Sequence, residues 1–197
     1  MDDQALIERF FAGDEAAFNT LVWRWEKPIY NFAYRYVGTA EVAKEVTQQT
    51  FIRAYRGLRR LKNRASFSSW LHQIALNISR DELRRRRPLL SMEEVHEEGA
   101  GHHLWAEPAD DPRDRPEAIA HNSHLAEALK RALLSLPEEQ RLVIIMKEYQ
   151  GLKFREIAEV VAAPVNTVKS RLYHGLAALR SLLEQWGIAQ EVVEDEL

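Results

Sequence analysis

The chain has 197 residues and no cysteine, and 27 Lys and Arg against 30 Asp and Glu give it a net charge of −3. Hydrophobic residues make up 46% of it, enough for a globular protein with a buried core. The missing cysteines exclude a disulfide scaffold and thiolate metal sites, and they fit a reducing compartment. The start MDDQALIERF is too acidic for a signal peptide and no apolar run is long enough to span a membrane, so we expect a soluble cytoplasmic protein without membrane insertion.

Charge is distributed unevenly along the chain. Residues 1–87 hold 16 Lys and Arg against 10 Asp and Glu, whereas residues 88–137 hold 4 against 10. Residues 138–183 hold 7 against 5, and the last fourteen residues hold five acids and neither Lys nor Arg. The total charge argues weakly against nucleic acid, but two basic blocks separated by an acidic segment indicate a polyanionic partner.

Helical periodicity extends over most of the chain and strand signals are nearly absent, which predicts an all-α fold. The first basic block is predicted to form four helices, at residues 3–12, 14–37, 40–61 and 67–87. Gly13 and Gly38 lie at the breaks after the first two helices. Thr39 is suited to cap the third.

The fourth helix carries the stretch SSWLHQIALNISRDELRRRRP, on which two stripes run side by side. The apolar stripe consists of Phe67, Trp70, Leu71, Ile74 and Ile78. The polar stripe consists of Trp70, Gln73, Asn77, Arg80, Arg84 and Arg87. One interpretation is a solvated basic helix end that Pro88 stops. The other is a nucleic-acid surface, with arginines for phosphates, amides for base edges and a ring for stacking.

An acidic segment follows, with four prolines, two glycines and no sustained period between residues 88 and 118. This composition predicts a flexible linker. Three histidines lie in it among glutamates, at His96, His102 and His103, which raises the alternative of a metal site. Their irregular spacing and the absence of a scaffold favour a solvated linker that holds no metal.

Helical signal returns from about residue 117, and Pro137 fits the first turn of a helix that ends near Gly151. Residues 154–183 then have the layout of a helix-turn-helix, with a second helix that Asn166 or Thr167 can cap. The predicted buried stripe of that helix is Val168, Leu172, Leu176, Leu179 and Leu183. The predicted outer face is Thr167, Lys169, Ser170, Tyr173 and His174, with Arg171 at the border and better placed for a phosphate than for a base edge.

This second block has two interpretations. An ordinary helical hairpin with a polar outer face would show much of the same pattern. Small hydrogen-bonding residues together with Lys and Arg at the start of the second helix favour DNA binding, because a recognition helix meets base edges there.

Two stretches resemble the extracytoplasmic-function sigma factors of bacterial RNA polymerase. LPEEQRLVIIMKEYQGLKFREIAEVVAAPVNTVKSRLYHGLAALR is similar to region 4 of that family, and EVTQQTFIRAYRGL with SFSSWLHQIALNISRDELRRRR is similar to region 2. The resemblance implies two small helical domains joined by a flexible linker: region 2 at 1–87, the linker at 88–116, region 4 at 117–187 and an acidic tail at 188–197. It also implies core RNA polymerase, promoter DNA and an anti-sigma factor as partners, and no cofactor.

The resemblance also assigns residues to three surfaces. Polymerase binding falls on Glu45, Gln48, Gln49 and Arg53, although the family has acids where Lys44 and Gln49 stand. Minus-ten recognition and melting fall on Asn63, Arg64, Ser66, Phe67, Trp70, Gln73 and Asn77, with Arg80 and Arg84 on phosphates; Trp70 is equally suited to the core. Minus-thirty-five recognition falls on Thr167, Lys169, Ser170 and His174, with Arg171 on the DNA backbone. His174 stands where the family often has Arg, which would make binding sensitive to pH.

Two other classes of function compete with a promoter-specificity subunit. The first is a stand-alone helix-turn-helix regulator whose N-terminal block is a sensor or dimerisation domain. Initiation by core polymerase at a promoter separates the two, because only a sigma factor supports it. The second is a helical enzyme, which is disfavoured because no catalytic constellation and no Gly-rich phosphate loop is present.

Overall fold

The computed structural model of the chain describes residues 2–90 and 116–188, with side chains described for 2–86 and 125–188. Within these ranges it consists of helices and turns without a β-strand, so the predicted all-α class is confirmed. None of the helices in these ranges is long and apolar enough to cross a bilayer. Nearly all of the predicted linker and tail, at 91–115 and 189–197, lies outside the described residues.

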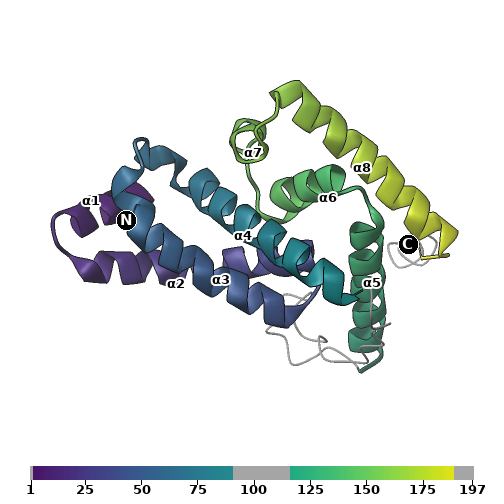
Figure 1. Ribbon diagram of the computed structural model, residues 1–197. Coiled ribbons are helices and arrows are strands. Elements are labelled where there is room, and N and C mark those ends of the chain that lie inside the picture. The colour runs from purple at the N-terminus through teal and green to yellow at the C-terminus, as the bar shows by residue number, and fades with distance from the viewer. Residues whose placement is uncertain (1, 91–115, 189–197) are drawn as a thin grey trace.

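The N-terminal domain contains four helices, and Figure 1 shows them gathered on one side of the molecule. They are α1 (Asp3–Phe11), α2 (Glu15–Val37), α3 (Ala40–Gly57) and α4 (Phe67–Leu90). Side chains of Asp2 and Asp14 accept backbone hydrogen bonds that cap α1 and α2. Gly38 ends α2 with φ of 88°, a left-handed conformation that glycine adopts without strain.

Three local expectations for this domain are wrong. Helix α3 ends at Gly57 and a 3₁₀ turn, Leu58–Arg60, follows it. Thr39 occupies the N-cap position but its side chain makes no capping hydrogen bond. Pro88 does not stop α4, which continues to Leu90. A proline removes one intrahelical hydrogen bond without always ending a helix, and α2 likewise continues past Pro28.

The C-terminal domain contains the predicted helix-turn-helix. Its elements are α5 (Pro116–Ser135), α6 (Glu138–Ile144), the π-helical turn η3 (Ile145–Tyr149), α7 (Phe154–Val161) and α8 (Val165–Gln185). The backbone N–H of Lys153 donates to Glu156 at 2.6 Å at the start of α7. Ala162 ends α7 in the left-handed region with φ of 50°, which turns the chain toward α8.

Helix α8 differs from the prediction at its start and on its buried face. It begins at Val165 with Pro164 as its N-cap residue, so neither Asn166 nor Thr167 caps it. Leu176, predicted to be buried, is exposed, and the buried residues are Val168, Leu172, Gly175 and Leu179. The reason is the crossing of α6, because a Cβ on Gly175 would lie 2.9 Å from Ile144 Cδ1. This crossing turns the neighbouring Leu176 outward.

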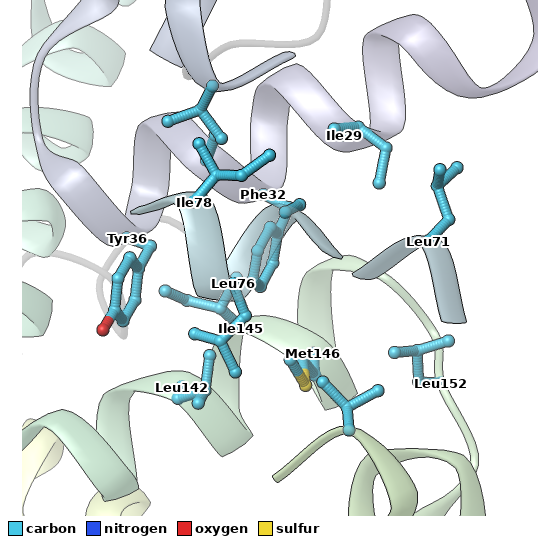
Figure 2. Close-up of a cluster of buried hydrophobic side chains, with 14 of the residues drawn as sticks. Ile29, Phe32, Tyr36, Leu71, Leu76, Ile78, Leu142, Ile145, Met146 and Leu152 are labelled. Atoms are coloured by element: carbon cyan, nitrogen blue, oxygen red, sulfur yellow. The ribbon is translucent and has the colours of Figure 1, made fainter. Parts of the chain in front are cut away.

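The two domains share one hydrophobic core, whereas the resemblance implies a separate core in each. Figure 2 shows side chains of α2 and α4, among them Phe32 and Leu76, facing Ile145 and Met146 of η3. Helix α7 packs on α4, and η3 packs on α2. The described parts of the two domains therefore form one packed body.

His72 lies in this shared core, on the side of α4 that faces the C-terminal domain. Its ring is fully buried, with Nδ1 2.8 Å from the Ser68 carbonyl oxygen. The rings of Trp25 and Phe32 contact it edge-on, at centroid distances of 5.9 and 5.3 Å. Burial lowers the pKa of His72 below its ordinary value, although the Ser68 carbonyl and the nearby Gln150 and Glu156 oppose that shift. The packed state thus favours the neutral ring.

We expect Ile145→Ala to lower the free energy of unfolding of the whole chain by about 2–5 kcal/mol, because it leaves a cavity in the shared core. Leu176→Ala, at an exposed position of α8, is the control and should change it by less than about 1 kcal/mol. Urea titrations followed by tryptophan fluorescence and by circular dichroism measure both. Two separate transitions in the unsubstituted protein would contradict a single shared core.

We also expect acid to weaken the fold through His72. Since its folded-state pKa is lowered, its contribution is complete above the ordinary value of about 6.5 and is lost as the pH falls below that. Unfolding measured between about pH 7.5 and pH 5 should show this loss, with a slope of at most about 1.4 kcal/mol per pH unit for one proton. His72→Gln should flatten the slope. An unaltered slope in His72→Gln would exclude His72 as its source.

Candidate nucleic-acid interface

The polar stripe predicted on α4 lies on the outer side of that helix. Gln73, Asn77 and Arg84 are exposed, whereas Leu71 and Leu76 on the same helix are fully buried. Helix α4 packs on α2, α3 and α7 through its buried side, so the stripe faces away from these neighbours. The structure therefore brings two amides and an arginine together on one open face. Arg87, the last member of the predicted stripe, is outside the residues with described side chains.

The two aromatic residues assigned to this surface differ in burial. Phe67 is only 1% exposed and packs against the rings of Trp25 and Trp70, at centroid distances of 6.2 and 5.9 Å. In this packed arrangement the core covers the Phe67 ring, which is therefore not accessible to a base. Trp70 is half-buried over α3, where a Cβ on Gly57 would lie 3.2 Å from its ring. One part of Trp70 packs in the core and the remainder stays at the surface.

The loop before α4 is a turn held by its own side chains. The Asn63 side chain accepts a hydrogen bond from the Ala65 N–H at 3.1 Å and donates one to Ser66 Oγ at 2.8 Å. These contacts close the short 3₁₀ turn η2 (Arg64–Ser66). Arg64, in this turn, donates from Nη1 to Glu8 of α1 at 2.8 Å. The two side-chain bonds of Asn63 give it a structural role in shaping the loop.

Arg80, the first arginine of the stripe, is bound by the other domain. Its Nε donates to Glu138 Oε1 at 2.8 Å, and the Tyr36 hydroxyl donates to the same oxygen at 2.7 Å. Burial raises the pKa of Tyr36 to about 12, and its hydrogen bond to Glu138 adds to this. Burial also acts to raise the pKa of Glu138, but the hydrogen bonds from Tyr36 and Arg80 outweigh it and hold that pKa below its usual value. Glu138 therefore stays ionised, and in the packed arrangement its carboxylate is the ion-pair partner of Arg80.

The four residues assigned to polymerase binding lie along α3. Gln48 and Arg53 are exposed, whereas Glu45 and Gln49 are half-buried. Glu45 lies 3.6 Å from the guanidinium of Arg86 on α4. The face that contains Gln48 also carries two exposed apolar side chains, Ile52 and Tyr55, which the sequence analysis did not assign to it. A mixed polar and apolar face of this kind is typical of a protein-binding surface.

The start of α8 presents the predicted duplex-reading side chains. Lys169, Ser170 and His174 are exposed, and Thr167 is half-buried. Arg171 lies at the edge of the buried face as predicted, but it forms an ion pair with Glu139 of α6 at 2.6 Å. An additional aromatic, Tyr173, is 66% exposed on the same face. To bind a phosphate, Arg171 must therefore release Glu139 or bind both groups at once.

Neither Glu138 nor Glu139 was singled out from the sequence. Both lie in the first turn of α6, where acids are common in any helix because they favour the positive end of its dipole. Because this preference is general, their contacts with Arg80 and Arg171 could not be inferred from it. Among the described residues no group of His, Cys, Asp and Glu is suited to hold a metal ion, and the three linker histidines lie outside those residues.

Comparisons with known proteins agree with this geometry. Residues 21–88 match the family described as Sigma-70 region 2, and residues 126–179 match Sigma-70, region 4. The chain is 33% identical to the ECF RNA polymerase sigma-E factor of Escherichia coli over 182 residues, which cover 91% of this chain and 93% of that protein. It is 33% identical to the RNA polymerase sigma-H factor of Pseudomonas aeruginosa over 188 residues, covering 92% and 94%.

Two solved structures share the fold. The sigma factor RpoE of Bartonella quintana, solved with the anti-sigma factor NepR, aligns with a TM-score of 0.66 and 20% identity over 85% of this chain and 96% of that one. CnrH, solved with the cytosolic domain of CnrY, aligns with a TM-score of 0.68 and 23% identity over 93% and 97%. Both sigma regions, in order, and relatives that are 33% identical over more than nine-tenths of the chain place this protein in the family of extracytoplasmic-function sigma factors of bacterial RNA polymerase.

Proposed function

We propose that this protein binds core RNA polymerase through α3 and directs it to promoters through α4 and α8. The observation that carries the proposal is the presence, in one chain, of two different exposed polar faces whose side chains suit nucleic acid. The α4 face combines amides, arginine and a half-exposed tryptophan, which suits separated bases. The α8 face presents lysine and small polar groups at the start of a recognition helix, which suits a duplex. The polymerase supplies the chemistry, in the cytoplasm.

On the promoter the two surfaces have to separate. The minus-ten and minus-thirty-five elements are about 25 base pairs apart, or about 85 Å along B-form DNA. In the structure α4 packs on α7, and α7 packs on α8, so two helix-packing distances of about 10 Å each separate the surfaces. We therefore infer that promoter binding opens the packed arrangement and releases Arg80 from Glu138.

We infer an anti-sigma partner as well. The inference rests on the family and on the two solved relatives, whose structures contain an anti-sigma factor and the cytosolic domain of CnrY respectively. Co-purification from the native cell tests it, and target transcription should rise when the partner is deleted. A stand-alone regulator with an N-terminal sensor domain is disfavoured, because residues 21–88 match a region of sigma factors. Transcription by core polymerase from a pool of promoters, with and without this protein, tests the proposed function itself.

We expect two substitutions to separate polymerase binding from promoter melting. Asn77→Ala removes an exposed amide from α4 and should weaken open-complex formation by about 1–3 kcal/mol, while affinity for core polymerase stays the same. Gln48→Ala on α3 is the matched control. It should lower the affinity for core polymerase and leave open-complex formation by the assembled holoenzyme unchanged. Permanganate footprints report the melted bases, and titration with core polymerase reports assembly. Normal melting in Asn77→Ala together with lost polymerase binding would reverse the two assignments.

We expect Lys169→Ala to relax the preference for one or two base pairs of the minus-thirty-five element, because Lys169 is exposed at the start of α8. Arg180→Ala, at an equally open position near the far end of that helix, is the control and should leave the preferred sequence unchanged. Selection from a randomised duplex library, with the full-length protein in holoenzyme, measures both. An unchanged preference in Lys169→Ala would remove Lys169 from the base-reading group.

A further inference from the structure

Helix α1 packs against the loop that precedes α4, although α1 lies outside both matched family regions. Two of its side chains hold Arg64 of that loop. Glu8 Oε1 accepts a hydrogen bond from Arg64 Nη1 at 2.8 Å, and the Arg64 guanidinium lies over the Phe11 ring at 5.1 Å from its centroid. A carboxylate at one edge and an aromatic ring at one face fix both the direction and the plane of the guanidinium.

This environment changes what Arg64 can bind. The Glu8 carboxylate, itself 62% exposed, lies beside the guanidinium, so a phosphate that approaches also meets a negative charge and gains less than at an arginine without this neighbour. Arginine has five N–H donors, and Glu8 engages one nitrogen, so donors remain for a neutral acceptor. The guanidinium is planar and held in place, so its remaining donors suit the acceptor edge of an unpaired base. They suit a phosphate less well, because the charge of the arginine is already paired with Glu8.

Arg84 provides the contrast on the same surface. Its side chain is 78% exposed, and its ion pair is made within its own helix, with Asp81 three residues earlier at 3.2 Å. An exposed pair of this kind is weak and screened by salt. Arg84 is thus free to turn toward a phosphate, whereas Arg64 is held from a second helix through two kinds of contact.

We propose that Glu8 and Phe11 are positioning residues that hold the Arg64 guanidinium as a reader of one minus-ten base rather than as a phosphate ligand. The proposal rests on the proposed function, in which this loop meets the separated strand. Helix α1 then contributes to promoter sequence preference without touching DNA itself. Glu8 also keeps Arg64 from adding to sequence-independent binding.

The test uses full-length variants assembled with core polymerase, a promoter pool randomised across the minus-ten element, and a series of salt concentrations. Arg64→Ala should reduce discrimination at one base position by about fivefold to a hundredfold, with the salt slope unchanged. Glu8→Ala and Phe11→Leu should relax preference at the same position by a few fold. Glu8→Gln keeps an acceptor for Arg64 but removes the charge, so it should retain the preference while raising the salt slope by about one unit.

Arg84→Ala is the matched control, and it should lower the salt slope by about one unit without a change of preference. A double substitution of Glu8 and Arg64 by alanine should reduce discrimination at that base position no further than Arg64→Ala alone, because Glu8 acts only through Arg64. Thermal unfolding of each variant checks that α1 still folds, because a structural loss would lower stability in Glu8→Gln and Glu8→Ala alike.

Two results would overturn the proposal. A lower salt slope with unchanged base preference in Arg64→Ala would make Arg64 a phosphate ligand. Unchanged preference in both Glu8→Ala and Phe11→Leu would remove α1 from base reading. Failure of the proposed function is a different result, because the unsubstituted protein would then support no initiation with core polymerase at any promoter in the pool.

Discussion

The packing of η3 onto α2 and of α7 onto α4 is the contact on which the rest of the arrangement depends. Ile145 and Met146 are fully buried and face side chains of α2 and α4 (Figure 2), so the cores of the two domains are continuous in this arrangement. The same contact brings Glu138 to Arg80 and encloses His72. Hydrophobic burial thus sets the geometry, and the polar groups at its edge are placed by it.

Three of the arginines on the surface that DNA is proposed to use form ion pairs with carboxylates. Arg64 has Glu8, Arg80 has Glu138, and Arg171 has Glu139. Each pair is made with another helix, and in each of them an incoming phosphate has to compete with a carboxylate. The amides of α4 and Lys169 of α8 remain open. The free protein therefore offers base-reading groups more readily than phosphate-binding ones, which favours sequence preference over general affinity for polyanions.

Much of the helix layout could be predicted from the sequence, because caps and apolar periodicity are local. Gly38 ends α2 and the small-residue turn separates α7 from α8, both near the predicted positions. The open stripe of α4 followed from helical spacing in the same way. The burial of Phe67 agrees with its place in the predicted apolar stripe. The outward turn of Leu176 and the partners of Arg80 and Arg171 could not be predicted, because each depends on a helix distant in the sequence. The Tyr36–Glu138 hydrogen bond, for example, joins residues 102 positions apart.

The shared core has a consequence for how the chain is made. The apolar face of α2 and α4 is completed by η3 and by α7, which ends at Val161, some 70 positions after the end of α4. At about 5–20 residues per second, that face stays uncovered for roughly 3–14 seconds during synthesis. A nascent chain at this stage presents Phe32 and Leu76 to solvent, so this interval is when the protein is most exposed to aggregation and to capture by chaperones.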